Sequence, residues 1–350
     1  MSTFIQLHLL VSYPPSNLNR DDLGRPKTAV MGGEQRLRIS SQCLKRAWRT
    51  SEVFENALAG HIGKRTKEMG TKIYNDLITE GVSEKNAKEW AGAIAEVFGK
   101  RKSESKDKPL QELEIEQLAH FAPEEISAIE TLIKNLIKEK RIPNEKELDL
   151  LRKNHKAADI AMFGRMLADK PKFNTEAAVQ VAHAITVHKA VVEDDFFSAV
   201  DDLNTGEEHS GSGHLGEAEF GAGVYYLYVC INKDLLMEHL TNDVELAKKA
   251  IRALVEAAIT ISPSGKQNSY ASGGLASYVL AEKGTVQPRS LSVAFLTPIT
   301  GKDILQGAIS ALTDTRKKLD TVYERSNDSC ELNGTEGKGK ISELLKFVEE

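Results

Sequence analysis

The segment RISSQCLKRAWRT at 38–50 carries the residue types and spacing with the clearest chemistry in the chain. Ser40 is a favourable N-cap for a helix, and Ile39 and Leu44 are spaced to form a hydrophobic staple around the helix start. Lys and Arg side chains beside the free backbone N–H groups of a helix's first turn can bind phosphate. The alternative interpretation is a solvated basic surface with no ligand. At about 100° per residue, one face of this helix carries Ser41, Gln42, Lys45, Arg46 and Arg49.

Charge is divided unevenly along the chain. Residues 20–50 hold eight Lys or Arg against three Asp or Glu, whereas residues 190–232 hold nine Asp or Glu and no Lys or Arg. The formal net charge of −5 therefore hides two blocks of opposite sign. Such asymmetry favours charged partners, nucleic acid among them.

Two adjacent carboxylates, Asp21 and Asp22, lie within the basic block. They could hold Mg²⁺ for phosphodiester cleavage. The alternative is a loop role in which they pair with Arg20 or Arg25. We favour the loop role.

The acidic block contains three further candidate motifs. Gly211, Gly213 and Gly216 spell GxGxxG, but an acidic loop precedes them and a strand follows, so a dinucleotide site is rejected. His209 and His214 are interpreted as solvated loop residues, not metal ligands. Phe196 and Phe197 are either packing anchors or base-stacking wedges. Outside the block, His183 and His188 are interpreted as core or strand-end histidines.

The elements that must position these residues follow from periodicity. Alternation at 5–11 predicts a strand with one buried face, and the apolar run VYYLYVCI at 224–231 predicts a strand buried on both faces. Residues 56–182 are mostly helical, with a charged loop at 99–109 and a helix passing into a strand at 176–188. The acidic block is expected to form a hairpin. Further helices are expected at 244–260, 303–319 and the C-terminus, and further strands at 36–39, 276–281 and 290–297.

Composition sets the outer limits. Hydrophobic residues make up 41% of the 350 and charged residues 28%, which excludes global disorder and a disulfide-stapled miniprotein. Three widely separated cysteines favour a reducing compartment. With no signal peptide and no apolar run of about 20 residues, we expect a cytoplasmic protein without membrane contact.

Several blocks together resemble the CasC family, the crRNA-binding backbone subunits of Cascade, the type I-E CRISPR effector. They are LNRDD at 18–22, GGEQRLRISSQCLKRAWR at 32–49, GRM at 164–166, AHAIT at 182–186, FSAVDDL at 197–203 and HLGEAEF at 214–220. The resemblance implies an α+β fold in which an RRM- or ferredoxin-like palm carries a helical fingers insertion and a β-hairpin thumb. We place the palm at 1–55, 183–192 and 222–350, the fingers at 56–182 and the thumb at 193–221.

The resemblance also implies which residues meet RNA. Arg20, Lys27, Ser40, Gln42, Lys45 and Arg49 would line the palm groove and hold the RNA backbone. We add the neighbouring Asn19, Arg38, Ser41, Arg46 and Arg165 to this set. Met166 and Phe197, with Ser198 beside it, would act as wedges where the thumb displaces a nucleotide.

The predicted function is therefore a non-enzymatic subunit that stacks head to tail along crRNA and presents it for pairing with target DNA. Its partners would be crRNA, the target strand, other copies of itself and other Cascade subunits, with no cofactor or metal. One alternative is a metal-dependent endoribonuclease that uses Asp21 or Asp22, as backbone subunits of type III CRISPR complexes use a loop Asp. The other is a stand-alone RRM-type RNA-binding protein.

Overall fold

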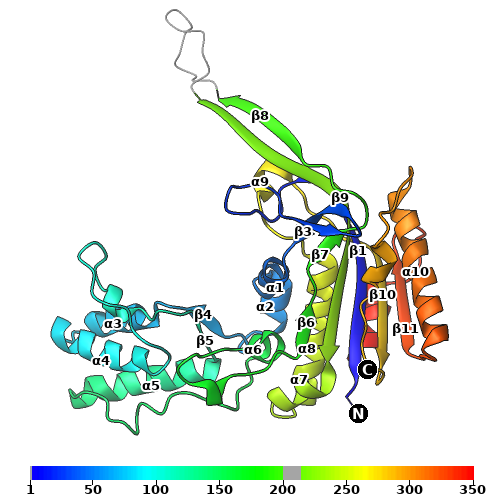
Figure 1. The fold of residues 1–350 in the computed structure, drawn as a ribbon. Helices are drawn as coiled ribbons and strands as arrows, with labels where there is room; N and C mark the ends of the chain where they lie inside the picture. The colour runs from blue at the N-terminus through cyan, green and yellow to red at the C-terminus, as the bar shows by residue number, and fades with distance from the viewer. Residues whose placement is uncertain (1, 200–213) are drawn as a thin grey trace, which may run out of the picture. The chain divides into compact units, whose positions relative to one another are not determined.

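A computed structural model describes residues 2–199 and 214–350 and divides the chain into two compact units. The first unit comprises residues up to 54, 180–231 and 251–350, and the second comprises 55–179 and 232–250. Figure 1 shows the elements of each. Residues 232–250, which the sequence analysis places in the palm, belong instead to the second unit, because the chain returns to it after the strand that ends at Asn232.

The first unit is built on an antiparallel sheet, so the fold is mixed α/β. The described residues give the sheet nine strands, with β11-β10-β1-β9-β7-β3-β2 in hydrogen-bonded order and β6 and β8 pairing β9. The strands are β1 (Phe4–Ser16), β2 (Thr28–Met31), β3 (Glu34–Ile39), β6 (Val179–Val181), β7 (Ala184–Thr186), β8 (Glu193–Ala199), β9 (His214–Asn232), β10 (Ala276–Gly284) and β11 (Asp328–Asn333).

Strand β1 is buried on both faces, so the expectation of one solvated face was wrong. Gln6 and His8 are as buried as the apolar residues beside them. They are accommodated because each has polar partners: His8 lies 2.9 Å from the Tyr226 hydroxyl, and the Gln6 side chain accepts a hydrogen bond from Tyr228. Polar residues that alternate with apolar ones in a strand can therefore be buried when hydrogen bonds satisfy their polar atoms.

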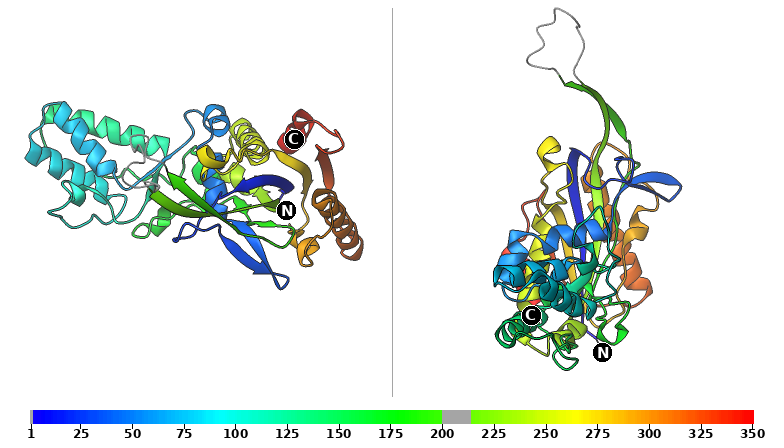
Figure 2. Two further views of the ribbon diagram at one scale, coloured as in Figure 1. Left: turned by 90° about the horizontal axis from the view of Figure 1, so that it is seen from above. Right: turned by 90° about the vertical axis from the view of Figure 1, so that its left-hand side faces the viewer.

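Helices cover the two faces of this sheet (Figure 2). On one face, Tyr226, Tyr278 and Phe295 form a core cluster with Ala308 and Leu312 of α10. Leu44 and Trp48 of α1 are buried as well, away from that cluster. The helices that include residues of this unit are α1 (Ser41–Arg49), α2 (Glu52–Ala57), α8 (Val244–Thr260), α9 (Gln267–Tyr270), α10 (Ile304–Val322) and α11 (Ile341–Glu349).

Two predicted segments differ in the structure. The expected strand at 290–297 is a 3-10 helix at Ser292–Phe295, and the expected helix near 176 is absent because 179–186 forms β6 and β7. Short apolar runs do not distinguish helix from strand, so long-range pairing decides. The strands expected at 36–39, 224–231 and 276–281 and the helices expected at 244–260, 303–319 and the C-terminus are confirmed.

The second unit has a separate helical core. Its elements are β4 (Lys64–Thr66), α3 (Met69–Thr79), α4 (Glu84–Glu96), β5 (Ala119–Phe121), α5 (Pro123–Glu139), α6 (Ala158–Phe163) and α7 (Lys233–His239). Ile73, Trp90 and Phe121 belong to one buried cluster. β4 and β5 form a separate two-stranded sheet.

The acidic block forms the expected hairpin, since β8 pairs antiparallel with the first half of β9. Residues 200–213 lie outside the described residues, and with them the candidate His209 and two of the three GxGxxG glycines. Within the two described ranges, the structure has no helix of the length and apolar content that crossing a bilayer requires.

Candidate nucleic-acid interface

Helix α1 begins as the sequence predicts. The Ser40 hydroxyl accepts a hydrogen bond from the backbone N–H of Cys43, and the first turn contains no acidic residue. Gln42 and Arg46 are exposed, and Lys45 and Arg49 are half-buried. Ser41 is instead among the buried residues of the helix, so its side chain is less accessible than the predicted RNA-binding face requires.

The loop before β2 is fixed to the start of α1. Asn19 Oδ1 accepts a hydrogen bond of 2.8 Å from the backbone N–H of Ser40, which orients the helix start. Asp21 Oδ1 accepts from the backbone N–H groups of Leu23 and Arg25. The predicted contact residues Arg20 and Lys27 are thereby held on an ordered loop, because the Lys27 N–H also donates to the Asn19 carbonyl.

Three cations from different elements converge around His183. Arg38 on β3 donates a hydrogen bond from Nη1 to His183 Nδ1 at 2.8 Å. Burial lowers the pKa of His183, and the positive charges of Arg38, Lys27 and Lys45 lower it further. Loop, strand and helix thus contribute charge to one exposed place, which is the geometry that a phosphate backbone requires. Of the two alternatives expected for His183, the strand end is confirmed and the core is not, because His183 directly precedes β7 and its side chain is exposed.

Arg36 belongs to the core and not to this surface. Its side chain is fully buried, and its guanidinium donates 2.9 Å hydrogen bonds to the carbonyls of Thr186 and Phe295. These bonds tie β3 to β7 and to the 3-10 helix. Arg36 therefore contributes no accessible charge, although it counts among the eight basic residues of the 20–50 block.

The prediction that Arg165 contacts RNA was wrong. Its side chain is buried in the second unit, where Nη1 lies 2.8 Å from Glu125 Oε2 and Nη2 donates to the Arg152 carbonyl. The carboxylate of Glu125 offsets the charge of the buried guanidinium, so the side chain of Arg165 is committed to the fold. The neighbouring Met166 is 72% exposed, which leaves its predicted wedge role sterically open.

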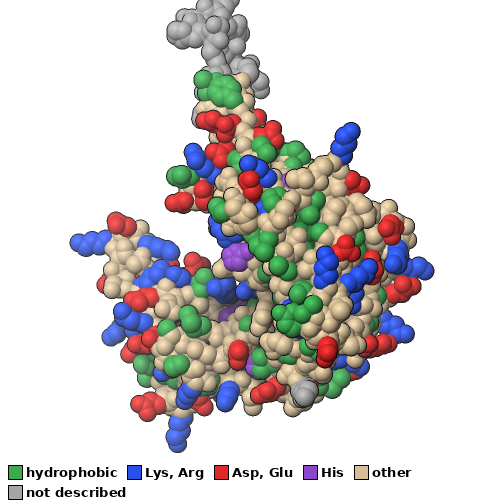
Figure 3. Space-filling view, turned by 45° about the vertical axis from the view of Figure 1, so that its right-hand side comes forward, with side chains coloured by type: hydrophobic (Ala, Val, Ile, Leu, Met, Phe, Trp, Pro, Cys, Tyr) green, Lys and Arg blue, Asp and Glu red, His purple; other side chains and the backbone are tan. Residues whose placement is uncertain are grey.

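The two hairpin phenylalanines lie on opposite faces of the hairpin. Phe197 is opposite Gly216 in the register, and its ring atoms occupy the space that a Cβ of Gly216 would need. Phe196 is opposite Glu217 and is 70% exposed. Phe197 thus combines a packing contact with 45% exposure, and Ser198 beside it is exposed. Acidic side chains gather along the described stem of the hairpin on the face in Figure 3.

The described residues contain no cluster of three His, Cys, Asp or Glu side chains arranged to hold a metal ion. Asp21 is occupied by backbone amides, and Arg25 pairs with Glu219 at 3.1 Å, not with Asp21 or Asp22. Four of the five cations of the charged loop at 99–109 form ion pairs: Lys100 with Glu116, Arg101 with Glu96, and Lys102 and Lys108 with Glu114.

Comparison with known proteins gives the family. The model of the CT1975-like proteins matches residues 5–344. The chain belongs to the CT1975-like family. A sequence search finds no match among curated proteins.

Two solved structures resemble this CT1975-like chain over nearly its whole length. A subunit of a "CRISPR RNA-guided surveillance complex, pre-nicking" has a TM-score of 0.85 and 30% identity, covering 99% of this chain and 100% of that chain. A subunit of another "CRISPR RNA-guided surveillance complex" has a TM-score of 0.61 and 27% identity, covering 97% and 92%.

Proposed function

We propose that this CT1975-like protein is a crRNA-binding backbone subunit of a type I-E CRISPR surveillance complex. The observation that carries the proposal is the convergence of Lys27, Arg38 and Lys45 around His183 beside the start of α1. Support comes from the two CRISPR surveillance-complex subunits that share its fold. Contacts to phosphate and sugar suit a protein that must accept any guide sequence.

The strand order supports an RRM-like palm within this proposal. Between β10 and β7 the sheet runs β10-β1-β9-β7, so the first and third strands of a βαββαβ unit lie at its centre. Helix α1 lies in the long connection between β1 and β7, and α8 lies in the connection between β9 and β10. The second unit would then be the fingers, and the β8–β9 hairpin would be the thumb.

The proposal includes head-to-tail stacking along crRNA, contact with other complex subunits and presentation of the guide to the target DNA strand. A head-to-tail contact needs two complementary patches on one chain. The acidic hairpin stem offers one patch, and the basic surface around Lys27 offers the other. The loop at 99–109 is a weaker partner than its sequence suggests, because four of its five cations already have carboxylate partners.

We assign the protein no catalytic role, no cofactor and a cytoplasmic location. A metal-dependent endoribonuclease would use Asp21 or Asp22, and no contact of either residue favours that function over a loop role. Size-exclusion chromatography with and without guide RNA tests assembly: RNA-dependent multimers support stacking, and a protein that coats RNA as non-cooperative monomers contradicts it.

The RNA-binding surface is tested by replacing Lys45 and Arg49 with Glu. Affinity should fall to a similar extent for all RNA sequences. The slope of log K against log salt concentration should become shallower by about one for each phosphate that is no longer neutralised. The matched control replaces Lys317 and Lys318 with Glu, since both lie on α10 and the charge change is the same. Equal binding by both double variants would contradict the proposed function.

A further inference from the structure

The β8–β9 hairpin joins the sheet through a short stretch in which the regular ladder is interrupted. Pairing of β9 with β8 ends at Phe220, and pairing of β9 with β7 begins at Tyr225. Residues 221–224 of β9 and residues 187–192 of the other chain segment lie between these pairs, and we call them the neck. Because four residues face six, regular strand pairing cannot continue across the neck, and other contacts must connect the hairpin to the sheet.

The side chain of His188 provides one such contact. His188 is half-buried two residues beyond β7, at the strand end expected from the sequence. Its Nε2 accepts a hydrogen bond of 3.2 Å from the backbone N–H of Val224, and its Nδ1 lies 2.8 Å from the carbonyl oxygen of Lys189. A carbonyl only accepts and an amide N–H only donates, so the ring carries its proton on Nδ1 and has a free lone pair on Nε2. The neutral imidazole therefore links the two chain segments of the neck.

Two glycines of β9 surround this contact. A Cβ on Gly223 would lie 2.7 Å from His188 Nε2, so a larger residue there would displace the imidazole. A Cβ on Gly221 would lie 2.7 Å from a methyl carbon of Leu37. Glycine in the interior of a strand weakens it and often marks a bend. His188 thus supports β9 where its backbone has the greatest freedom to bend.

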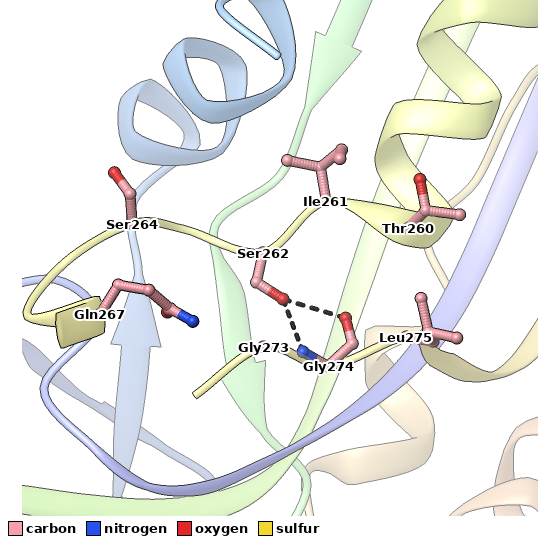
Figure 4. Close-up of a pocket in the computed structure, with 8 residues that line it drawn as sticks. All are labelled: Thr260, Ile261, Ser262, Ser264, Gln267, Gly273, Gly274 and Leu275. Atoms are coloured by element: carbon pink, nitrogen blue, oxygen red, sulfur yellow. Dashed lines mark hydrogen bonds between the residues drawn. The ribbon is translucent and has the colours of Figure 1, made fainter. Parts of the chain in front are cut away.

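A second support of the hairpin does not depend on a histidine. The Tyr270 ring of α9 lies 6.2 Å from the ring of Phe220, on the hairpin side of the neck. The segment that carries Tyr270 is closed by the Ser262 hydroxyl, which accepts a hydrogen bond from the Gly274 N–H and donates to the Gly274 carbonyl (Figure 4). Burial raises the pKa of Tyr270, and the negative charge of Asp195 raises it further, so the ring is uncharged at neutral pH. This contact offers a comparison that does not titrate near neutral pH.

Charged side chains on the elements around the neck have partners of their own. The contacts are Lys189 with Glu34, Arg25 with Glu219, and Arg36 with the Thr186 carbonyl. Two carboxylates are thus already neutralised by cations. Glu193, at the start of β8, is exposed, so solvent and salt screen its attraction for a charged imidazole. Among these groups, no buried carboxylate is left to stabilise a protonated His188.

We propose that His188 is a positioning residue that fixes the hairpin to the sheet while its imidazole is neutral and releases the hairpin when the imidazole is protonated. In the imidazolium both ring nitrogens are donors, so Nε2 would face the N–H of Val224 donor to donor. β9 could then bend at Gly221 and Gly223, and Phe197 on the hairpin would move with it. This inference goes beyond the proposed function, because the change occurs in the protein without RNA.

Amide hydrogen exchange of the free, full-length protein tests the proposal. The protection of the Val224 amide is measured from about pH 8 to about pH 5, the range in which histidine side chains take up a proton, and is corrected for the intrinsic pH dependence of exchange. It should fall by about three- to tenfold, the range expected for the loss of one hydrogen bond. The amide of Val279, on β10 of the same sheet, should keep its protection, which separates opening of the neck from global unfolding.

Two variants of His188 separate titration from packing. His188→Gln keeps an acceptor near the position of Nε2 but does not titrate, so the protection of Val224 should no longer depend on pH. His188→Ala should give low protection at every pH. Tyr270→Ala is the control, because it removes the other support of the hairpin and should leave the pH dependence at Val224 in place.

Constant protection of Val224 in the wild type across this range would overturn the proposal. A pH dependence that persists in His188→Gln would do the same, because another group would then be titrating. No RNA is present in these measurements, so either outcome leaves the proposed RNA-binding function standing. That function is contradicted separately, by full RNA binding in the Lys45 and Arg49 variant.

Discussion

The guanidinium of Arg38 donates to Nδ1 of His183 at 2.8 Å, so the imidazole accepts a hydrogen bond from a cation on the surface where RNA is proposed to bind. The neutral imidazole fits this arrangement, because protonation of Nδ1 would set two donors against each other. In the free protein the pKa of His183 is lowered by burial and by the charges of Arg38, Lys27 and Lys45.

This relationship predicts that RNA binding takes up a proton. A phosphate among the cations would offset their charge and raise the pKa of His183 in the complex above that in the free protein. Affinity should therefore increase as the pH falls from about 8 to about 5. Filter binding across this range measures it, with His183→Asn as the comparison. Parallel pH profiles for wild type and variant would show that His183 is not the group that titrates.

A second prediction concerns the buried carboxylate of Glu282. Burial alone would raise its pKa, but hydrogen bonds from His8 and Arg289 lower it overall, so the group is ionised at neutral pH. Arg316 on α10 also contacts it, at 3.0 Å. Glu282→Gln should reduce the free energy of unfolding by about 3 kcal/mol, the lower end for breaking a buried ion pair, because Asp320 still pairs with Arg289 and Arg316.

Denaturant unfolding measures this loss, and Asp314→Asn, a change elsewhere on α10, should shift stability by less than about 0.5 kcal/mol. The stabilisation by Glu282 should be complete above the ordinary pKa of glutamate and be lost as the pH falls below it. Wild-type stability in Glu282→Gln would mean that the arginines find other partners.

The third prediction is that the loop acids do not cleave RNA. Purified protein incubated with labelled RNA and Mg²⁺ or Mn²⁺ should leave the RNA intact, since Asp21 is engaged by backbone N–H groups. Asp22→Ala should bind RNA as wild type does. Metal-dependent cleavage that disappears in Asp22→Ala would establish the endoribonuclease instead.

The fourth prediction separates the two hairpin phenylalanines. Phe197→Ala should weaken RNA binding by about 1–3 kcal/mol if the ring stacks on a base. Phe196→Ala, on the opposite face, should leave RNA affinity close to wild type. Thermal unfolding is measured in parallel: a lower melting temperature of Phe197→Ala with unchanged RNA affinity would limit Phe197 to packing on Gly216.

Local patterns predicted the elements that local chemistry controls. The Ser40 cap and the apolar spacing of Leu44 and Trp48 were enough to place α1, and continuous apolarity was enough to place the buried half of β9. The RNA-binding roles of the α1 side chains remain predictions.

Tertiary partners decided the rest. Arg36 and Arg165 have the same side chain as exposed arginines, but both are buried. Arg36 donates a hydrogen bond to a carbonyl 259 residues away, and Arg165 to a carboxylate 40 residues away. The same applies to Lys266 and Tyr270, which line one cavity together with residues of the 17–25 loop and of the hairpin. No short window of sequence contains such information.

The pairing of β1 with β10 also has a consequence for synthesis. Leu7 faces Ala281 across the ladder with β10, and β9 lies on the other side of β1. An apolar strand made at the very start must therefore await β9, whose centre is translated more than two hundred residues later, and then β10. At about 5–20 residues per second, the nascent chain carries that strand without either partner for roughly 10–40 s. The intervening residues 55–179, which make up most of the second unit, can fold in that time. The rate of synthesis and chaperone binding to the N-terminal strand should therefore determine the fraction of the protein that avoids aggregation.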